Sequence, residues 1–286
     1  AETLREIRET LLKAAGLLRH HRALVWNADD GLLLMSLVRA CPEGLVCGVC
    51  RSETGRSALE QYSRTLEAVD KPQLAARGVE AAPGAFEIPP EACAGVPFDR
   101  LFFRDMFVSV ESIAQFRAGL VAAGAAGRLA PDWKALLSQR IPIAGQQLSA
   151  LIRDQILQNR EGKFASILQA MEGAESRFYA DPGQPLFAWD AKTIADVLGG
   201  PQGTEAAQFS VTVESRVFYE KRRLAQTDVH AWFNGEKSPY GKAVREALGD
   251  DTEHIMGLLL EAAQNRLLFD WKTETAFVAI TPCLVH

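Results

Sequence analysis

The sequence predicts an α/β fold: a Rossmann-like, mostly parallel sheet with an antiparallel pair of strands at one edge and a helical insertion. Short apolar runs alternate with amphipathic helical segments through the first half, which indicates right-handed crossovers between parallel strands. The first apolar run ends in a polar turn that leads directly into a helix, as in a nucleotide-binding sheet. A long alternating segment and a final apolar segment enclose helices near the end, which indicates the antiparallel pair.

The composition is that of an ordinary globular protein. The chain has 286 residues, of which 48% are hydrophobic and 23% are charged, enough for one large domain or a domain with an appended subdomain. Its net charge of −5 provides no general basic field for nucleic acid. No apolar run reaches the roughly 18 residues that cross a bilayer, and the charged N-terminus is unlike a signal peptide. We expect a cytoplasmic protein without a membrane partner.

The five cysteines favour a structural role in a reducing compartment. Cys47 and Cys50 form a CxxC pattern inside an apolar strand, where the two thiols point to opposite faces. A redox pair would instead sit at the start of a helix. The number is odd and the spacing fits no zinc site; the others are Cys41, Cys93 and Cys283.

In the first half, apolar periodicity and breaking residues place the elements in order. We expect a helix over 2–20, a strand at 23–27, a helix from 31 to about 40, a strand at 44–50 and a helix from 53 to about 69 that Ser52 caps. A weaker strand near 79–82, a strand at 98–103, a helix that begins at Ser109 or Ser112, and a strand at about 128–139 follow.

The second half changes character, since helical stripes replace the alternation. We expect helices over 146–180, a break at 181–185, a short helix from Asp190 to Leu198, a long strand at 207–224, a helix capped by Thr227, a helix at 251–267 and a strand at 271–280. The predicted organisation is an N-terminal helix (1–21), a Rossmann-like core (22–145), a helical insertion (146–205) and a C-terminal strand pair with helices (206–286).

The opening turn is the first candidate for a ligand site. Asn27 ends the first strand at its carboxyl end, where open α/β sheets bind ligands, and Gly31 permits a tight turn. Asp29 and Asp30 stand at the start of the next helix, where they either cap the helix or contact a ligand. Their negative charge disfavours a phosphate and leaves a zwitterionic or cationic ligand.

Two further strand ends carry polar candidates. After the second strand, Arg51 can pair with Asp29 or Asp30 across the crevice. Glu53 either reaches back to the ribose hydroxyls that a nucleoside-binding fold places there or serves as an acid in the first helical turn. Asp105 follows the 98–103 strand, where residues that touch substrate usually lie, and is either a base or a capping or loop carboxylate. The basic–aromatic run 218–223 is either a solvated strand end or a nucleic-acid contact.

The order of elements resembles class I S-adenosylmethionine-dependent methyltransferases. That family opens with an acidic residue and GxGxG; Asn27, Asp29, Gly31 and Leu33 stand at the matching positions, and only the middle glycine is kept. The resemblance implies S-adenosylmethionine as the cofactor, bound by residues of the opening turn and of the second strand end: Asn27, Ala28, Asp29, Gly31, Arg51 and Glu53. It implies methyl transfer to an acceptor, with Asp105 as the catalytic candidate.

A more specific resemblance is to the methyltransferase-like domain fused, in some bacteria, to RarA-type AAA+ recombination ATPases. That domain has NAGSGLL, VPEGG, YADP, NWD and SYG segments. The corresponding segments here are NADDGLL (27–33), CPEG (41–44), YADP (179–182), AWD (188–190) and SPYG (238–241), in the same order. The resemblance implies, as an alternative, a non-catalytic scaffold linked to such an ATPase in DNA maintenance.

Overall fold

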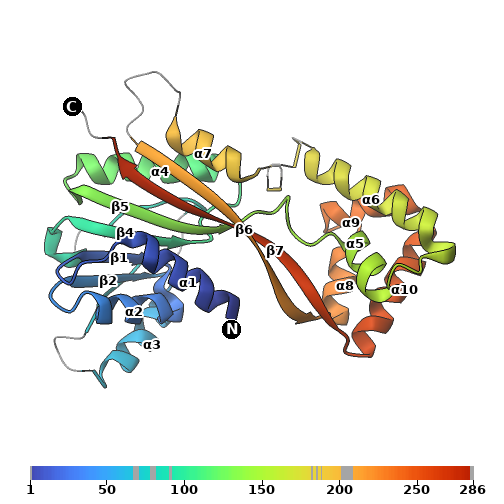
Figure 1. Cartoon of the computed structure of the whole chain (residues 1–286), viewed down its shortest axis with the longest axis horizontal. Coiled ribbons are helices and arrows are strands. Elements are labelled where there is room, and N and C mark those ends of the chain that lie inside the picture. Colours follow the sequence, from blue (N-terminus) through green and yellow to red (C-terminus); the bar gives the residue numbers. More distant parts are fainter. Residues whose placement is uncertain are drawn as a thin grey trace. The chain divides into compact units, whose positions relative to one another are not determined.

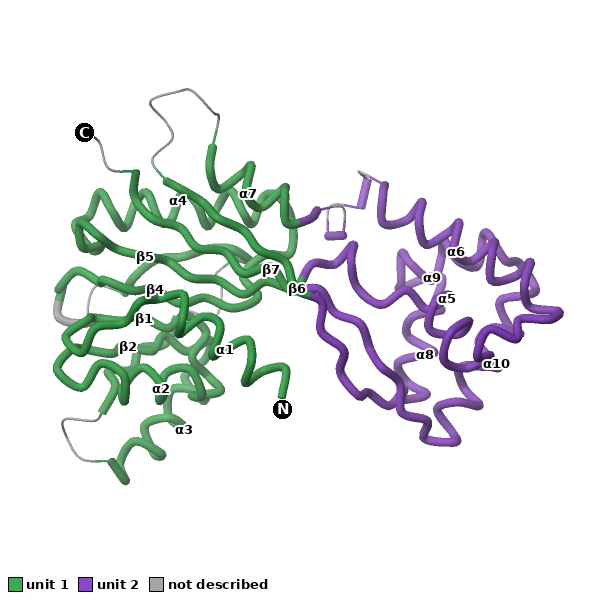
Figure 2. The backbone as a smooth tube through the Cα atoms, viewed as in Figure 1, with its two compact units in different colours: residues 1–140, 191–216, 275–286 green, residues 141–190, 217–274 purple. Residues whose placement is uncertain are grey.

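The chain divides into two units, which are coloured separately in Figure 2. The computed structural model describes residues 2–66, 71–77, 82–89, 92–181, 183–184, 186–187, 189–200 and 209–283. Unit 1 comprises Ala1–Arg140, Ala191–Arg216 and Thr275–His286, and unit 2 comprises Ile141–Asp190 and Val217–Glu274. No helix in the described part of the chain is both long and apolar enough to cross a membrane.

A seven-stranded sheet is the main element of the fold (Figure 1). Its strand order is β3-β2-β1-β4-β5-β7-β6. The first five strands run parallel, and β7 runs antiparallel to β5, from Ala135 opposite Ile280 to Arg140 opposite Thr275. The strands are β1 (Arg22–Trp26), β2 (Leu45–Cys50), β3 (Gln73–Ala76), β4 (Phe98–Arg104), β5 (Leu129–Arg140), β6 (Phe209–Arg223) and β7 (Leu268–Pro282). This order confirms the predicted Rossmann-like methyltransferase fold.

Helices flank the sheet in unit 1. They are α1 (Glu2–Ala15), α2 (Leu32–Ala40), α3 (Glu53–Ser63), α4 (Val110–Ala125) and α7 (Ala191–Gly199). The central strands β1, β2 and β4 bury nearly every side chain, as expected for parallel strands covered on both faces. Phe86, Phe103 and Phe116 stack edge to face or tilted beside the sheet, with ring centroids 4.8–5.9 Å apart. This core fixes the ends of the central strands, where the candidate residues lie.

Unit 2 is mainly helical. Its helices are α5 (Leu148–Leu151), which continues as a π-helical turn (Ile152–Ile156), α6 (Ala165–Ala180), α8 (Gln226–Trp232), α9 (Pro239–Leu248) and α10 (Asp251–Gln264). Their apolar stripes form one core, which includes the fully buried Leu151, Met171, Phe233 and Leu259. The helices expected in the insertion and those between the last two strands therefore pack together.

Capping residues explain several helix boundaries. The Ser52 hydroxyl accepts a hydrogen bond from the Gly55 N–H and begins α3, as predicted. Ser109 begins α4, and Ser112 completes the capping box, so both candidate serines take part. The first helix ends at Ala15 rather than at residue 20 because Gly16 takes a positive φ of 55°.

Other element predictions are wrong in position. The sequence did not predict the strand at Gln73–Ala76, and the strand that it predicted near 79–82 lies largely outside the described residues. The predicted cap at Thr227 is wrong, because the helix begins one residue earlier, at Gln226, after an extended Ala225. The helical stretch 146–180 is interrupted where Gln158 and Asn159 take positive φ angles, so α6 begins only at Ala165.

Candidate functional site

The candidate site lies at the carboxyl ends of β1, β2 and β4. Strand β1 has β2 on one side and β4 on the other, so the chain reverses its direction of travel across the sheet at β1. Doubly wound sheets bind ligands at such a switch point, just beyond the carboxyl ends of the strands. The turn after β1 and the residues after β2 and β4 therefore border the same edge.

The turn after β1 is shaped by two left-handed residues. Asn27 has φ 61° and ψ 51°, a short 3₁₀ turn (Ala28–Asp30) follows, and Gly31 has φ 66°. A Cβ at Gly31 would come 2.8 Å from the Leu59 Cδ2 atom, and Ala28 is buried. The positive φ therefore favours glycine at position 31 independently of any ligand, and a side chain there would also displace the end of the Leu59 side chain.

Asn27 carries an unused acceptor. Its side-chain Nδ2 donates a long hydrogen bond to the Met106 Sδ atom at 3.6 Å. Its Oδ1 atom is buried and has no hydrogen-bond partner among the described residues, and the indole Nε1 of Trp26 is in the same situation. Because a buried polar atom without a partner is costly, Asn27 Oδ1 is the atom here that most calls for a donor from a ligand or water.

Asp29 bridges β1 to β2. Its carboxylate accepts two hydrogen bonds from the backbone N–H of Arg51, at 3.0 and 3.1 Å. A Cβ at Gly55 would lie only 2.3 Å from Asp29 Oδ1, so α3 has a glycine where this carboxylate approaches. Asp29 therefore contacts Arg51 as one of the alternatives expected, but through the backbone rather than the guanidinium.

Asp30 bridges β1 to β4. Its Oδ1 accepts a hydrogen bond from the Leu32 N–H at 3.1 Å, which is a capping interaction at the start of α2. Its Oδ2 pairs with Arg104 Nη1 at 3.0 Å. Both side chains are more than 40% exposed, so the ion pair contributes at most about 1 kcal/mol and opens easily.

The ends of β2 and β3 carry cations. Cys50 lies opposite Ala76 in the parallel register, so Arg51 and Arg77 follow on neighbouring strands, and the Arg77 N–H bonds the Cys50 carbonyl at 2.9 Å. Burial and the Arg51 charge lower the pKa of Arg77. Sequence reasoning missed Arg77 because it predicted no strand at Gln73–Ala76.

Glu53 behaves as an acid of the first turn of α3. It pairs with Arg56 one turn further on, and the hydrogen bond from Arg56 lowers its pKa. This is the second of the two roles that the sequence left open. Its role toward a cofactor stays a prediction.

Asp105 lies directly after β4 in a left-handed conformation, with φ 47°. Its carboxylate accepts from the Arg140 N–H at 3.2 Å and pairs with the Arg140 guanidinium at 3.3 Å, and Arg104 lies 3.8 Å away. Two arginines thus hold the side chain at the carboxyl end of β4. Arg104 also contacts Asp30, and sequence reasoning missed this link because it considered only Asp105.

A small cavity lies beside this edge. It measures about 40 Å³ and lies among residues of α1, β1 and β4, including Ile7, Trp26, Asn27, Asp30 and Arg104. A space of this size holds a water molecule or two. Asn27 therefore borders a small cavity on the α1 side, and neither Asp29 nor Arg51 lines it.

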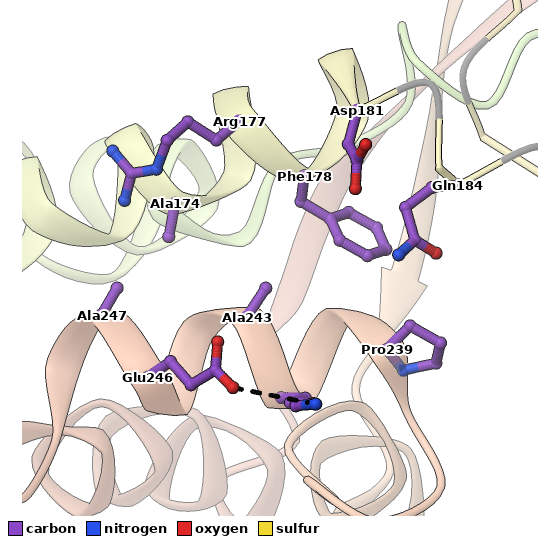
Figure 3. Close-up of a pocket in the computed structure, with 10 residues that line it drawn as sticks. Ala174, Arg177, Phe178, Asp181, Gln184, Pro239, Ala243, Glu246 and Ala247 are labelled. Atoms are coloured by element: carbon purple, nitrogen blue, oxygen red, sulfur yellow. Dashed lines mark ion pairs between the residues drawn. The ribbon is translucent and has the colours of Figure 1, made fainter.

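Unit 2 contains a larger cavity, of about 530 Å³, between α6 and α9 (Figure 3). Beside it, Glu175 is fully buried and accepts hydrogen bonds from the Leu148 N–H at 2.9 Å, from the Tyr240 hydroxyl at 2.7 Å and from the Ser149 hydroxyl. Burial raises the pKa of Glu175, and these hydrogen bonds only partly oppose the rise.

Metal and thiol chemistry receive no support from the described residues. No group of three or more His, Cys, Asp or Glu side chains there is arranged to hold a metal ion. The side chains of Cys47 and Cys50 are buried in β2, and burial raises the pKa of Cys50 to about 12. A thiol with such a pKa is unreactive, which agrees with a structural role for the CxxC pattern.

Comparison with known proteins gives only distant structural likenesses. No protein-family model matches the chain, and no curated protein matches it. The solved structures that it resembles include the YcgJ protein from Bacillus subtilis, with a TM-score of 0.47, 12% identity and coverage of 97% of this chain and 98% of that one.

Two further likenesses concern proteins solved with cofactor or product. Phosphoethanolamine N-methyltransferase 2 from Haemonchus contortus, in complex with S-adenosylmethionine, has a TM-score of 0.47 at 12% identity, over 97% of this chain and 53% of that one. Mycolic acid cyclopropane synthase, complexed with S-adenosylhomocysteine, has a TM-score of 0.45 at 17% identity, over 97% and 83%. Since these scores are below 0.5, the fold assignment rests on the strand order of the chain itself.

Proposed function

We propose that unit 1 binds S-adenosylmethionine at the carboxyl ends of β1, β2 and β4 and transfers the methyl group to an acceptor. The observation that supports this most directly is Asn27: the switch point of a methyltransferase-type strand order coincides with a buried amide oxygen that has no partner among the described residues. S-adenosylmethionine carries an ammonium group, ribose hydroxyls and an adenine amine, each of which can donate to such an oxygen.

The other residues at this edge of the sheet would hold the turn in place around the cofactor. Asp29 fixes the turn against β2 through the Arg51 N–H. The Asp30–Arg104 pair is exposed, so water competes with it and Arg104 can turn away at little cost. Asn27 would hold a donor group of the cofactor, and Gly31 keeps the loop tight.

The bound cofactor would supply an electrophilic methyl group on a sulfonium centre. The task of the protein is then to orient an acceptor in line with that methyl group and to exclude water. Asp105 is the residue that we assign to the acceptor side, since Arg104 and Arg140 fix its carboxylate at the end of β4. In this role it orients the acceptor through a hydrogen bond.

A second function is favoured by one specific observation. In the family that the sequence resembles, a glycine stands where this chain has Asp29, and here that carboxylate occupies the space beside the Arg51 N–H and Gly55, beyond the end of β2. A cofactor-binding turn that is occupied by a side chain of the protein itself favours a non-catalytic, methyltransferase-like scaffold. The resemblance to RarA-linked domains supplies the partner class for that role, a AAA+ recombination ATPase.

Calorimetric titration of the full chain with S-adenosylmethionine and S-adenosylhomocysteine separates the two functions. We expect binding, and we expect Asn27→Gly to weaken it about tenfold, because glycine keeps the positive φ and deletes only the amide. Asn159→Gly is the matched control, since Asn159 has the same φ of 61° but lies in unit 2. Absence of heat at millimolar ligand would exclude the enzyme and leave the scaffold.

A further inference from the structure

The cavity between α6 and α9 has the dimensions of a small-molecule site. Its volume of about 530 Å³ lies within the roughly 300–1,000 Å³ usual for ligand pockets. In Figure 3, side chains of α6 and of α9 face one another across it, and all of its lining residues belong to unit 2. They are Ala174, Arg177, Phe178, Asp181, Gln184, Pro239, Lys242, Ala243, Glu246 and Ala247.

Small residues create this space. Ala174 projects from α6 toward Ala243 and Ala247, which lie one turn apart on α9 (Figure 3). Ala174 is buried, Ala243 is half-buried and Ala247 is exposed, so the space opens to solvent. The alanines form its apolar floor, and an apolar ligand that covers them would remove apolar surface from water.

Aromatic rings form one wall. Phe178 is buried, 5% exposed, and its ring meets the rings of Tyr240 and Phe187 at centroid distances of 5.8 and 5.4 Å. Such a wall favours a further ring in edge-to-face or offset contact. The aromatic wall and the alanine floor together select a flat, apolar body.

One positively charged side chain at the rim of the cavity, that of Arg177, has no partner among the described residues. Asp181 accepts a hydrogen bond from the Gly183 N–H at 2.8 Å, and Glu246 lies 3.9 Å from Lys242. Arg177 makes no hydrogen bond or ion pair with any residue in the described part of the chain. A guanidinium binds a carboxylate through two parallel hydrogen bonds, so the rim favours an anionic group at the Arg177 end.

We propose that the α6–α9 cavity binds a small aromatic carboxylate, with its ring against Phe178 and the alanine floor and its carboxylate on Arg177. This site is separate from the cofactor edge of unit 1 and does not depend on the proposed methyl transfer. It gives unit 2 a ligand of its own.

Titration of the full chain with 2-naphthoate, and with the uncharged 2-naphthamide as comparison, tests this site. We expect one molecule of 2-naphthoate per chain, bound about tenfold more tightly than the amide, as a charged hydrogen-bonded pair contributes. Arg177→Gln should abolish the preference for the anion. Arg160→Gln, an exposed arginine of the same unit, should leave the affinity unchanged.

Variants that fill the cavity provide a second test of the proposal. Ala243→Leu or Ala247→Leu should remove binding of both naphthalenes while the melting temperature stays at or above that of the wild type, because the added methyl groups enter existing space. Affinity for S-adenosylhomocysteine should not change. Absence of naphthoate binding, an equal loss in Arg160→Gln, or full binding by both leucine variants would each overturn the proposal.

Discussion

The two units bury a carboxylate in opposite ways. In unit 1, Asp99 is 8% exposed and is held by a cation: Arg22 donates from Nε at 2.9 Å, from Nη2 at 3.0 Å and from its backbone N–H at 2.7 Å. In unit 2, Glu175 is fully buried, and its donors are hydroxyls and backbone N–H groups that carry no charge.

The difference shows in the pKa of each group. Burial alone would raise the pKa of Asp99, but the hydrogen bonds and the charge of Arg22 outweigh it, and the pKa falls. Burial raises the pKa of Glu175, and four neutral hydrogen bonds do not cancel the rise. A charged partner therefore keeps a buried carboxylate ionised, whereas neutral donors alone do not offset the burial that favours its protonated form.

Removing Glu175 should produce the largest effect. In Glu175→Ala, the Tyr240 hydroxyl, the Ser149 hydroxyl and the Leu148 N–H lose their acceptor in the interior of unit 2. We expect a loss of about 3–5 kcal/mol of unfolding free energy, from several unsatisfied groups and a cavity. Hydrogen exchange detected by mass spectrometry measures this loss of stability separately in each unit, through the exchange protection of α5 and α6 for unit 2.

Glu261→Ala is the matched control, because Glu261 is an exposed glutamate on α10 of the same unit. It should change stability by less than about 0.5 kcal/mol. If the two variants lose equal stability, the interior of unit 2 does not depend on its buried carboxyl group.

Breaking the Asp99–Arg22 pair should cost less. Asp99→Asn keeps the shape but removes the charge, and it leaves Arg22, whose side chain is 32% exposed, able to reach water. We expect a loss of about 1–3 kcal/mol in unit 1, seen as faster exchange in β1 and β4 with α5 and α6 unchanged. An Asp99→Asn variant as stable as the wild type would show that the pair contributes nothing.

The two carboxylates predict opposite pH dependence. Glu175 has a raised pKa, so its cost grows as pH rises above the unfolded value of 4.5 and disappears as pH falls back toward it. Asp99 has a lowered pKa, so its contribution is complete above 3.8 and is lost only as pH falls below that value. Lowering pH from about 7 to about 5 should therefore increase exchange protection in unit 2 and leave the Asp99 contribution in unit 1 unchanged.

Glu175→Gln tests the assignment of this pH dependence. The amide cannot ionise, so the gain of protection in α5 and α6 on acidification should disappear in this variant. A gain that persists would assign the effect to another group of unit 2.

Sequence periodicity was sufficient for the sheet but not for the groups that matter chemically. The strand 98–103 and the opening turn were predictable because apolar runs and breaking residues mark them. Glu175 was missed although it falls on the buried stripe of Leu168, Met171 and Phe178. Periodicity indicates which positions are buried, but it does not show which hydrogen-bond donors stabilise a buried carboxylate. Those donors, on Ser149 and Tyr240, come from segments 26 and 65 residues away.

The positions of the candidate site residues were predictable from the sequence, but their hydrogen-bond and ion-pair partners were less so. The ends of β1, β2 and β4 follow from the topology rule, so Asn27, Asp29, Arg51 and Asp105 were all placed at one edge. The pairing of carboxylates with arginines depends on how far each side chain reaches across the strands, which the sequence does not show. The sequence predicted that Arg51 pairs with one of the aspartates, whereas in the structure Asp30 pairs with Arg104.

The smallest effect should come from that exposed pair. Asp30→Ala removes both the Arg104 contact and the capping bond to the Leu32 N–H. Because the ion pair is solvated and an exposed cap is replaced partly by water, we expect unit 1 to lose about 0.5–1 kcal/mol. Arg104→Gln keeps the capping bond and removes the exposed ion pair with Asp30 together with the longer, 3.8 Å contact with Asp105. It should lose less than about 0.5 kcal/mol. If Arg104→Gln instead destabilises unit 1 as much as Asp99→Asn, the pair is a structural clamp across β1 and β4, and its easy opening for a cofactor is excluded.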